Sequence, residues 1–298
     1  MRSPAAPALL FYVAASTLVA FSEAAMAQGA PSDPPLAIHG FNDVTLKNDY
    51  ITPRGLLVSS NRFTTQILNG LVLNTYHNPA DAIDDISLVA GIWNDIDAGQ
   101  HSTTVGPWNE FDWFVGANFE IYKIWTLGVT YVAFLSPPGN FSTEHNIEFS
   151  LQLDDSSLLA PISLHPYAKL FYQVAGPSVV VTGTGGTFDV ELGVVPTLDL
   201  HPYNIPAKLT MPTWITVGPS DFWGGGGNAG VFSTGLTTTW PLDSIPKQFG
   251  NWNVHFGVQY YHLINDQLLV AQTLIGSAGS GSGHRDVVVG FGGIGLNF

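Results

Sequence analysis

The chain has 298 residues, a net charge of −14, only 11% charged residues and no cysteine, while Gly (32) and aromatic residues (12%) are abundant. A chain this acidic is unsuited to binding nucleic acid or anionic lipid through charge. Beyond the N-terminal region, no apolar stretch reaches the roughly 18 to 20 residues that a membrane-spanning helix needs, which argues against a helical inner-membrane protein.

The N-terminus has the features of a secretory signal peptide. Arg2 precedes an almost wholly apolar stretch from Ala8 to Phe21, and Ala25-Met26-Ala27 is a small-x-small cleavage site. We therefore expect residues 1–27 to be removed, residues 28–35 to form a flexible lead-in, and residues 36–298 to form one domain. An exported chain is free to use disulfides, so the absence of cysteine means that other interactions hold the fold.

From residue 36 onward the chain consists of segments of about 10 to 15 residues with β-propensity, separated by clusters of Gly, Pro, Asn, Asp and Ser. Twelve strands are predicted, at 37–51, 63–77, 84–97, 108–121, 124–136, 144–154, 163–174, 186–198, 206–217, 228–240, 251–264 and 285–298. An even number of strands places both termini on the periplasmic side of an outer-membrane barrel.

Several segments alternate strictly between apolar and polar residues. In segment 108–121, Trp113 and Val115 share one face, and Glu110 and Asp112 share the other. A soluble β-sandwich has the same period, so alternation alone does not decide the class. Strand length, the signal peptide, the inward carboxylates and the terminal Phe298 together favour an all-β, transmembrane, antiparallel up-and-down β-barrel of about 12 strands in the bacterial outer membrane.

The connections indicate the topology. Tyr122-Lys123 is predicted to form a tight periplasmic turn, and residues 265–284 a long external loop that contains the low-complexity run from Gly276 to Gly283. We expect the aromatic Phe298 at the end of the last strand to be read by the barrel assembly machinery.

Short motifs in the first half of the chain carry a family resemblance. They are Asn48-Asp49-Tyr50 followed by Arg54-Gly55, then Gly91-Ile92-Trp93, Glu110-Phe111-Asp112-Trp113, and Tyr131 with Pro138-Gly139. In these motifs the chain resembles the TorF-like porins of Gram-negative bacteria over about residues 37–150; the Pro-Pro-Gly turn and Pro53 depart from the family pattern. The resemblance implies an outer-membrane barrel that is porin-like in shape, and it implies no particular solute.

Charged residues on the predicted inner face are the candidate pore lining. They are Glu110, Asp112, Glu120, Glu148, Asp154, Lys169, Asp189, Glu191 and Lys208. Opposite charges on adjacent strands form cross-strand pairs, so one interpretation is a salt-bridged wall that supports the barrel. The other is an acidic path that favours cations.

Arg54 and Arg62 flank the first predicted external loop and are candidate pore-mouth residues. Paired arginines there would bind phosphate or carboxylate groups of a solute or of lipopolysaccharide. The alternative is that they are solvated or paired with Asp. The outer-membrane lipid around the barrel is the other expected partner.

The sequence favours a protein that is not an enzyme. Ser59, Ser60 and His77 are a nucleophile and a base by residue type only, and nothing resembles the motifs of outer-membrane phospholipases. His165, His201, His255 and His262 have no metal-ligand spacing, and no cofactor or phosphate-binding motif is present. No catalytic residue, metal or cofactor is therefore expected.

The favoured function is passive diffusion of small hydrophilic solutes through a polar lumen with a mild cation preference. The alternative is a closed, non-conducting barrel that acts in envelope structure or surface interactions; a lipid-active enzyme, with a Ser-His pair on the outer wall, is the third option. Lumen filling discriminates the first two, and six inward aromatic residues are available to fill it: Phe114, Phe134, Tyr167, Phe171, Trp214 and Tyr261.

Overall fold

A computed structural model describes residues 37–60, 63–97, 107–139, 141–159, 161–176, 186–275 and 283–298. The predicted signal peptide, the lead-in and Arg62 lie outside the described residues. So does most of the low-complexity run, residues 276–282.

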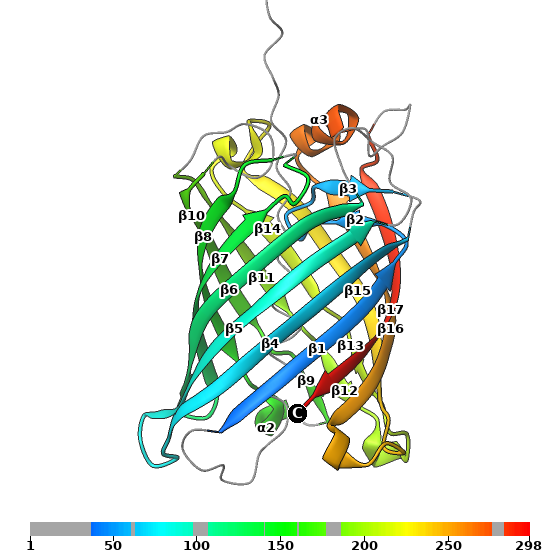
Figure 1. Cartoon of the computed structure of the whole chain (residues 1–298). Helices are drawn as coiled ribbons and strands as arrows, with labels where there is room; N and C mark the ends of the chain where they lie inside the picture. The colour runs from blue at the N-terminus through cyan, green and yellow to red at the C-terminus, as the bar shows by residue number, and fades with distance from the viewer. Residues whose placement is uncertain are drawn as a thin grey trace, which may run out of the picture.

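The described residues form a closed antiparallel barrel of twelve strands, which confirms the predicted fold class (Figure 1). The ring runs β14-β11-β10-β8-β7-β6-β5-β4-β1-β17-β16-β15, and the pairing of β14 with β15 closes it. Closure pairs the backbone groups around the ring, which is the condition for a sheet to span a membrane. The strands of the ring are β1 (Ile38–Lys47), β4 (Thr64–His77), β5 (Ile83–Asp97), β6 (Trp108–Ile121), β7 (Trp125–Leu135), β8 (Glu144–Leu153), β10 (Tyr167–Ala175), β11 (Phe188–Val194), β14 (Thr213–Val217), β15 (Ala229–Pro241), β16 (Asn251–Leu263) and β17 (Asp286–Asn297).

Three predicted strands are interrupted where the backbone lacks a donor or is bent. Segments 186–198 and 206–217 each break at a proline, Pro196 and Pro212, because proline has no N–H for the ladder. The short continuations are β12 (Thr197–Asp199) and β13 (Lys208–Thr210). Segment 163–174 is interrupted before Pro166, and β9 (Ile162–Ser163) precedes the break.

The first predicted strand, 37–51, is shorter than expected. β1 ends at Lys47, and the chain then turns into a small hairpin of β2 (Tyr50–Ile51) and β3 (Leu57–Ser59), which pair only with each other. We call residues 48–59 the hairpin. In Figure 1 it lies at the end of the barrel opposite the C-terminus. We call this the outer end and the end with the chain terminus the periplasmic end.

The predicted external loop after β16 contains a helix that the sequence analysis missed. α3 (Asp266–Ile275) buries Leu268, Ala271 and Ile275 along one face, and the Asn265 side chain accepts a hydrogen bond from the Gln267 N–H at 2.9 Å. The three buried residues recur at the period of an α-helix, and Asn265 acts as the N-cap. The other helical turns are α2 (Ser156–Leu159), η1 (His201–Tyr203), η2 (Ser220–Trp223) and η3 (Lys247–Phe249). Within the described residues, no helix is long and apolar enough to cross a membrane.

Apolar residues face outward and polar residues face inward on the barrel wall, as the alternation predicted. Trp113 and Val115 are 38% and 48% exposed on the outside, whereas Glu110 and Asp112 are buried inside. Inward aromatic rings lie over glycines of neighbouring strands: a Cβ on Gly70 would stand 2.1 Å from the Phe41 ring. Glycine at such positions lets bulky rings lie flat against the wall.

The predicted tight turn between β6 and β7 is confirmed. Tyr122 and Lys123 both have positive φ, 52° and 59°. These angles are typical of a two-residue type I′ turn, which matches the twist of the flanking strands. Residues with a Cβ carry this conformation at a cost, because the left-handed region favours Gly and Asn.

Replacing Tyr122 with Asn and Lys123 with Gly is therefore expected to stabilise the barrel by about 1 kcal/mol. Urea unfolding of the refolded protein in detergent, followed by tryptophan fluorescence, measures the gain. Lys123→Ala is the matched control, because it shortens the side chain while leaving a Cβ at positive φ, and it should give no gain. Equal stability of the Asn-Gly variant and the control would contradict the expectation.

Candidate functional site

The hairpin folds inward and fills the outer half of the lumen. Between Ile51 and Ser59 every residue except Pro53 is buried. One end contacts β5, where the Tyr50 and Trp93 rings lie 5.8 Å apart. The other reaches β14, where Trp214 Nε1 donates to the Pro53 carbonyl at 3.4 Å. Because β5 and β14 lie on opposite sides of the ring, the hairpin crosses the lumen.

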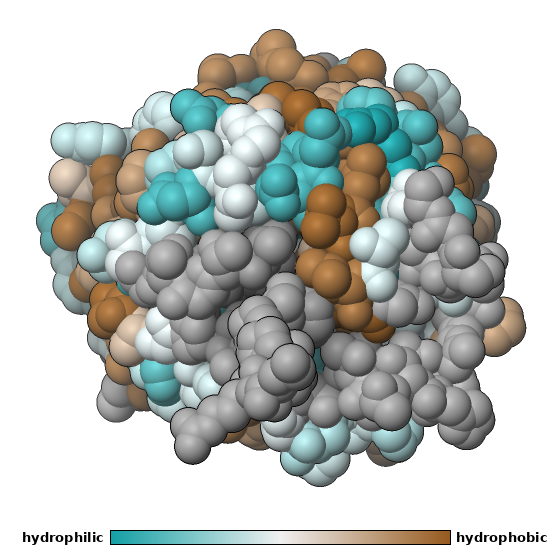
Figure 2. Space-filling model, turned by 90° about the horizontal axis from the view of Figure 1, so that it is seen from above, coloured by the Kyte–Doolittle hydropathy of each residue, from teal (hydrophilic) through white to brown (hydrophobic). Residues whose placement is uncertain are grey.

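Apolar residues of two further segments pack against the hairpin. Phe222 and Trp223 of η2 and Leu268 of α3 belong to the same hydrophobic cluster as Leu56 and Val58. We call the hairpin, η2 and α3 together the cap. Viewed onto the outer end, the described surface alternates between hydrophilic and hydrophobic patches (Figure 2).

Arg54 is the central charge of the cap. Its Nε lies 3.1 Å from Asp189 Oδ1 on β11, and the two side chains are 1% and 0% exposed. Its guanidinium carbon lies 4.4 Å from the centre of the Phe171 ring, 5.7 Å from that of Phe134 and 5.9 Å from that of Phe222. The sequence analysis expected Arg54 at the pore mouth; the structure places it inside the barrel, because the hairpin turns inward after β1.

A hydrogen bond at the base of the hairpin joins it to a second charged region. The Tyr50 hydroxyl donates to Glu110 Oε2 at 2.9 Å. Glu110 lies on β6 directly opposite Asp95 on β5, and Thr64 Oγ1 donates to Asp95 Oδ1 at 2.5 Å. The hairpin is thus attached to both sides of the inner wall, by Tyr50 on one side and by Arg54 on the other.

Carboxylates dominate the buried inner wall. In the described part of the chain, the buried cationic side chains are Arg54 and Lys169. Lys47, half-buried at the end of β1, is a third cation on this wall and interacts with Asp43 and Asp95. The buried carboxylates on the barrel strands are Asp43, Asp84, Asp95, Asp97, Glu110, Asp112, Glu144, Glu148, Asp189 and Glu191. Asp84 lies at the periplasmic turn beside Lys123, away from the hairpin. The lumen is therefore strongly acidic around the hairpin.

Six of the predicted pore-lining residues surround the hairpin on this wall. They are Glu110, Asp112, Glu148, Lys169, Asp189 and Glu191. Lys169 stands directly opposite Glu191 in the register of β10 and β11, so opposite charges face each other across these two strands. Glu191 also accepts a hydrogen bond of 2.8 Å from the Tyr167 hydroxyl.

The other predicted pore-lining residues lie toward the periplasmic end. Glu120 is half-buried near the end of β6, opposite Thr126. Asp154 lies beyond the end of β8 and is exposed, and Lys208 on β13 stands opposite Asp199 on the short β12 extension. These three residues therefore do not join the buried group around Arg54.

One buried carboxylate in the group was missed by the sequence analysis. Glu144, the first residue of β8, is 1% exposed and interacts electrostatically with Arg54. It has the same parity as Glu148 on β8, so the alternation alone was sufficient to find it.

The aromatic residues predicted to fill the lumen are mostly buried. Phe114, Phe134, Tyr167, Phe171 and Tyr261 are buried, and Trp214 is partly buried against the same cluster. Filling is uneven along the barrel axis. Toward the periplasmic end the inward side chains are half-buried, among them Asn118, Thr126, Gln152 and His255.

The Ser and His residues considered for catalysis do not meet. Ser59 is buried in the hairpin, while His77 ends β4 and lies 3.2 Å from Asp85. Among the described residues, no group of three or more His, Asp or Glu is arranged to hold a metal ion.

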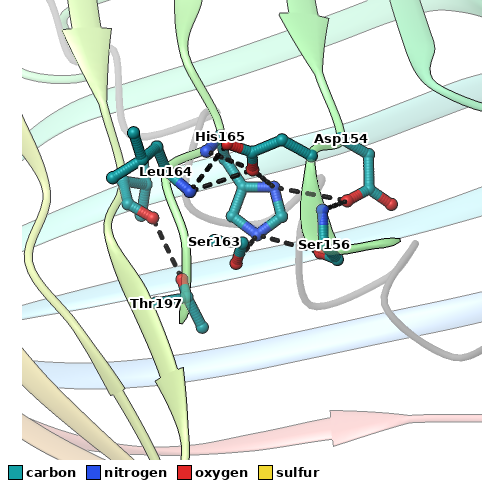
Figure 3. A network of polar contacts seen from close by, with 8 residues as sticks. Asp154, Ser156, Ser163, Leu164, His165 and Thr197 are labelled. Atoms are coloured by element: carbon teal, nitrogen blue, oxygen red, sulfur yellow. Dashed lines mark hydrogen bonds and ion pairs between the residues drawn. The ribbon is translucent and has the colours of Figure 1, made fainter. Parts of the chain in front are cut away.

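A different Ser-His-Asp group lies near the break between β9 and β10 (Figure 3). His165 Nε2 is 2.6 Å from Ser163 Oγ, but its Nδ1 is 3.6 Å from Asp154 Oδ1 and 3.9 Å from Asp155 Oδ1, beyond hydrogen-bond range. Asp155 instead accepts the backbone N–H groups of Leu164 and His165 at 2.9 and 3.0 Å. The group fixes the connection at His165, whose φ is 42°.

Asp155→Ala is expected to destabilise the barrel by about 1–3 kcal/mol, because it leaves two backbone donors without an acceptor. Burial by itself raises the pKa of Asp155, but the N–H groups of His165 and Leu164 outweigh it and hold the pKa below its usual value. The contribution of this carboxylate to stability is therefore complete above the pKa of Asp in the unfolded chain, about 3.9. It is lost as the pH falls through the lower pKa of Asp155 in the folded protein.

Urea unfolding at neutral pH and at about pH 3 measures this difference. The difference in the free energy of unfolding between the native protein and Asp155→Ala should be smaller at the lower pH. The neighbouring Asp154→Ala is the control, since Asp154 is exposed, accepts one backbone hydrogen bond, from the Ser156 N–H, and lies 3.6 Å from His165 Nδ1. A gap that widens as the pH falls would contradict the assignment.

The closed ring and apolar outer wall define a β-barrel of the type found in the bacterial outer membrane. No family model matches the chain, and no curated protein matches it. Among solved structures, an outer membrane channel from Pseudomonas putida F1 superimposes with a TM-score of 0.50 at 10% identity, over 91% of this chain and 100% of that chain.

Two further structures resemble the barrel at a lower level. A bacterial polysaccharide outer membrane secretin gives a TM-score of 0.47 at 9% identity, over 89% of this chain and 99% of that one. OprB of Pseudomonas putida gives 0.41 at 9% identity, over 89% and 94%. The similarity to the Pseudomonas putida F1 channel supports the outer-membrane barrel fold alone.

Proposed function

We propose that the protein is a porin-like channel of the bacterial outer membrane, for passive diffusion of small hydrophilic solutes with a mild cation preference. The observation that carries the proposal is the excess of carboxylates over cationic groups on the inner wall. Fixed negative charge lining a lumen attracts cations and repels anions. The half-buried polar side chains toward the periplasmic end are consistent with a hydrated entrance.

In the conformation described, the cap closes the outer half of the lumen. Solute passage therefore requires the hairpin to leave its place between β5 and β14. β2 and β3 pair only with each other, so within the described residues Tyr50 and Arg54 attach this part of the hairpin to the wall by their side chains. The backbone bond to the wall lies at the start of the hairpin, where the Asn48 N–H donates to the Gly290 carbonyl of β17. A hairpin that is not part of the wall is able to move without breaking the barrel.

Membership of the TorF-like porins is part of the same proposal. So are the partners: outer-membrane lipid, lipopolysaccharide at the outer end, and the assembly machinery at Phe298. The Phe298 backbone exchanges hydrogen bonds with Gly40 of β1 at 2.7 and 2.9 Å, so this residue extends the seam between the first and last strands.

The second candidate is a non-conducting barrel that acts through its surface. The observation that favours it is the cap, whose hydrophobic cluster includes fully buried residues such as Trp223, Leu263 and Leu268. Single-channel recording discriminates the two, because a permanently capped barrel carries no current under any condition.

Glu148→Gln is expected to reduce the cation-to-anion permeability ratio by roughly twofold, because it removes one fixed charge from the inner wall. The reversal potential of the refolded protein in a planar bilayer under a potassium chloride gradient measures this ratio. Asp243→Asn is the control with the same charge change, since Asp243 is exposed in the turn after β15. A reversal potential in Glu148→Gln that equals that of Asp243→Asn, or that lies further in the cation direction, would sink the acidic-lumen proposal.

A further inference from the structure

Arg54 occupies a site whose other parts belong mostly to the barrel wall. Phe134 is on β7, Phe171 on β10 and Asp189 on β11, and all three are buried. Arg54 itself comes from the hairpin. If the hairpin withdraws, these wall residues remain and present the same surface to the lumen.

The rings and carboxylates of this site favour an organic cation. A guanidinium carbon 4.4 Å from the Phe171 centroid, with Phe134 and Phe222 also within 6 Å, is held by cation–π attraction. A guanidinium is more weakly hydrated than an ammonium and stacks on aromatic faces, so an aromatic wall favours it. Anions are disfavoured because the side chains of Asp189, Glu144 and Glu148 all interact electrostatically with the position of the Arg54 guanidinium.

Several hydrogen-bonding atoms of Arg54 and of the surrounding wall have no hydrogen-bond partner in the described part of the chain. Among the described residues, neither Nη atom of Arg54 has a hydrogen-bond partner, and neither do Glu148 Oε1 or the two Asp189 oxygens. Arg54 thus contacts Asp189 through Nε, at 3.1 Å from Oδ1, and its two Nη atoms add no hydrogen bond to the described residues. A free cation, which is not tethered to a hairpin, is able to orient its N–H groups toward these acceptors.

We infer that this site binds organic cations bearing a guanidinium group, and that Arg54 is a tethered occupant that competes with them. The inference rests on the proposed channel function and names its solute class. Binding of such a solute displaces Arg54 and with it the hairpin. The occupied site therefore belongs to the open lumen and the Arg54-filled site to the closed one.

The test uses Arg54→Ala in the full mature chain, refolded in detergent and inserted into planar bilayers. Its current in potassium chloride is expected to exceed that of the native protein by about fivefold or more, because the lumen stays open. Millimolar guanidinium should reduce this current by at least about half, because a cation held in the open lumen obstructs the passage of K⁺. Urea is the matched probe, because it is planar and of similar size but uncharged. Lys247→Ala, in the exposed η3 turn, controls for the loss of one positive charge and should behave as the native protein.

Phe171→Leu in the Arg54→Ala background tests the aromatic wall. It is expected to weaken guanidinium block by about tenfold, since it removes the nearest ring. A conducting Arg54→Ala channel that guanidinium blocks no better than urea would overturn the inference while leaving the channel function intact.

Binding is also measured without current, as the midpoint of heat unfolding of detergent-solubilised Arg54→Ala followed by gel mobility. Millimolar guanidinium should raise this midpoint and urea should not. A raised midpoint in a protein that never conducts would support the cation site and contradict the channel. An unchanged midpoint together with unblocked current would contradict the site.

Discussion

Asp189→Ala is expected to destabilise the packed hairpin by about 3–5 kcal/mol, because it leaves the Arg54 guanidinium buried without its ion-pair partner. Arg54 is 1% exposed, so water does not replace the lost carboxylate in the packed conformation. The hairpin therefore leaves the lumen more often. Fluorescence of Trp214, whose indole N–H contacts the Pro53 carbonyl, reports its departure during a urea titration.

The double variant Arg54→Met with Asp189→Leu is the control for this prediction. It removes both charges and fills similar volume, so its stability should lie close to that of the native protein. Comparing the single and the double variant separates the effect of an uncompensated charge from the effect of lost packing. Equal destabilisation in the single and the double variant would contradict the ion pair as the element that holds the hairpin.

Trp223→Ala is expected to destabilise the cap by about 3–5 kcal/mol through the cavity that it leaves. Trp223 is fully buried, its ring lies 4.5 Å from that of Phe222, and a Cβ on Gly230 would stand 2.2 Å from it. Loss of the ring removes support from η2, which places Phe222 over Arg54. Limited proteolysis in detergent should show cleavage within the cap while the barrel stays intact.

Trp240→Ala is the matched control, because it deletes the same side chain from the lipid-facing side of β15, where Trp240 is 40% exposed. It should leave the cap resistant to protease. Cleavage of the control at the same rate as Trp223→Ala would show that the cap does not depend on Trp223.

The strands were predictable from sequence because lipid outside and a polar lumen inside impose a period of two on every segment. The Lys169–Glu191 pair was equally accessible, since the two residues lie on consecutive strands with matching parity. The departures occur where a local feature interrupts the ladder, as at Pro196 and Pro212. α3 was missed because the neighbouring glycine-serine run dominated the composition of that loop.

The inward fold of the hairpin was not predictable in the same way. Thr52-Pro53-Arg54-Gly55 has the composition of an exposed turn, and Arg54 meets Asp189 only after the ring has closed and brought β11 opposite β5. The apolar run Leu56-Leu57-Val58 was the available signal, because an exposed loop has little reason to carry three consecutive apolar residues.

The most direct test of the account compares single-channel currents of the intact protein and a variant in which residues 49–59 are replaced by a short Gly-Ser linker. Both are recorded in planar bilayers under the same potassium chloride gradient. We expect a closed or low-conductance intact protein and a variant with large, stable steps and a cation-directed reversal potential. A variant that stays silent although folded and heat-modifiable, or that passes anions preferentially, would contradict it.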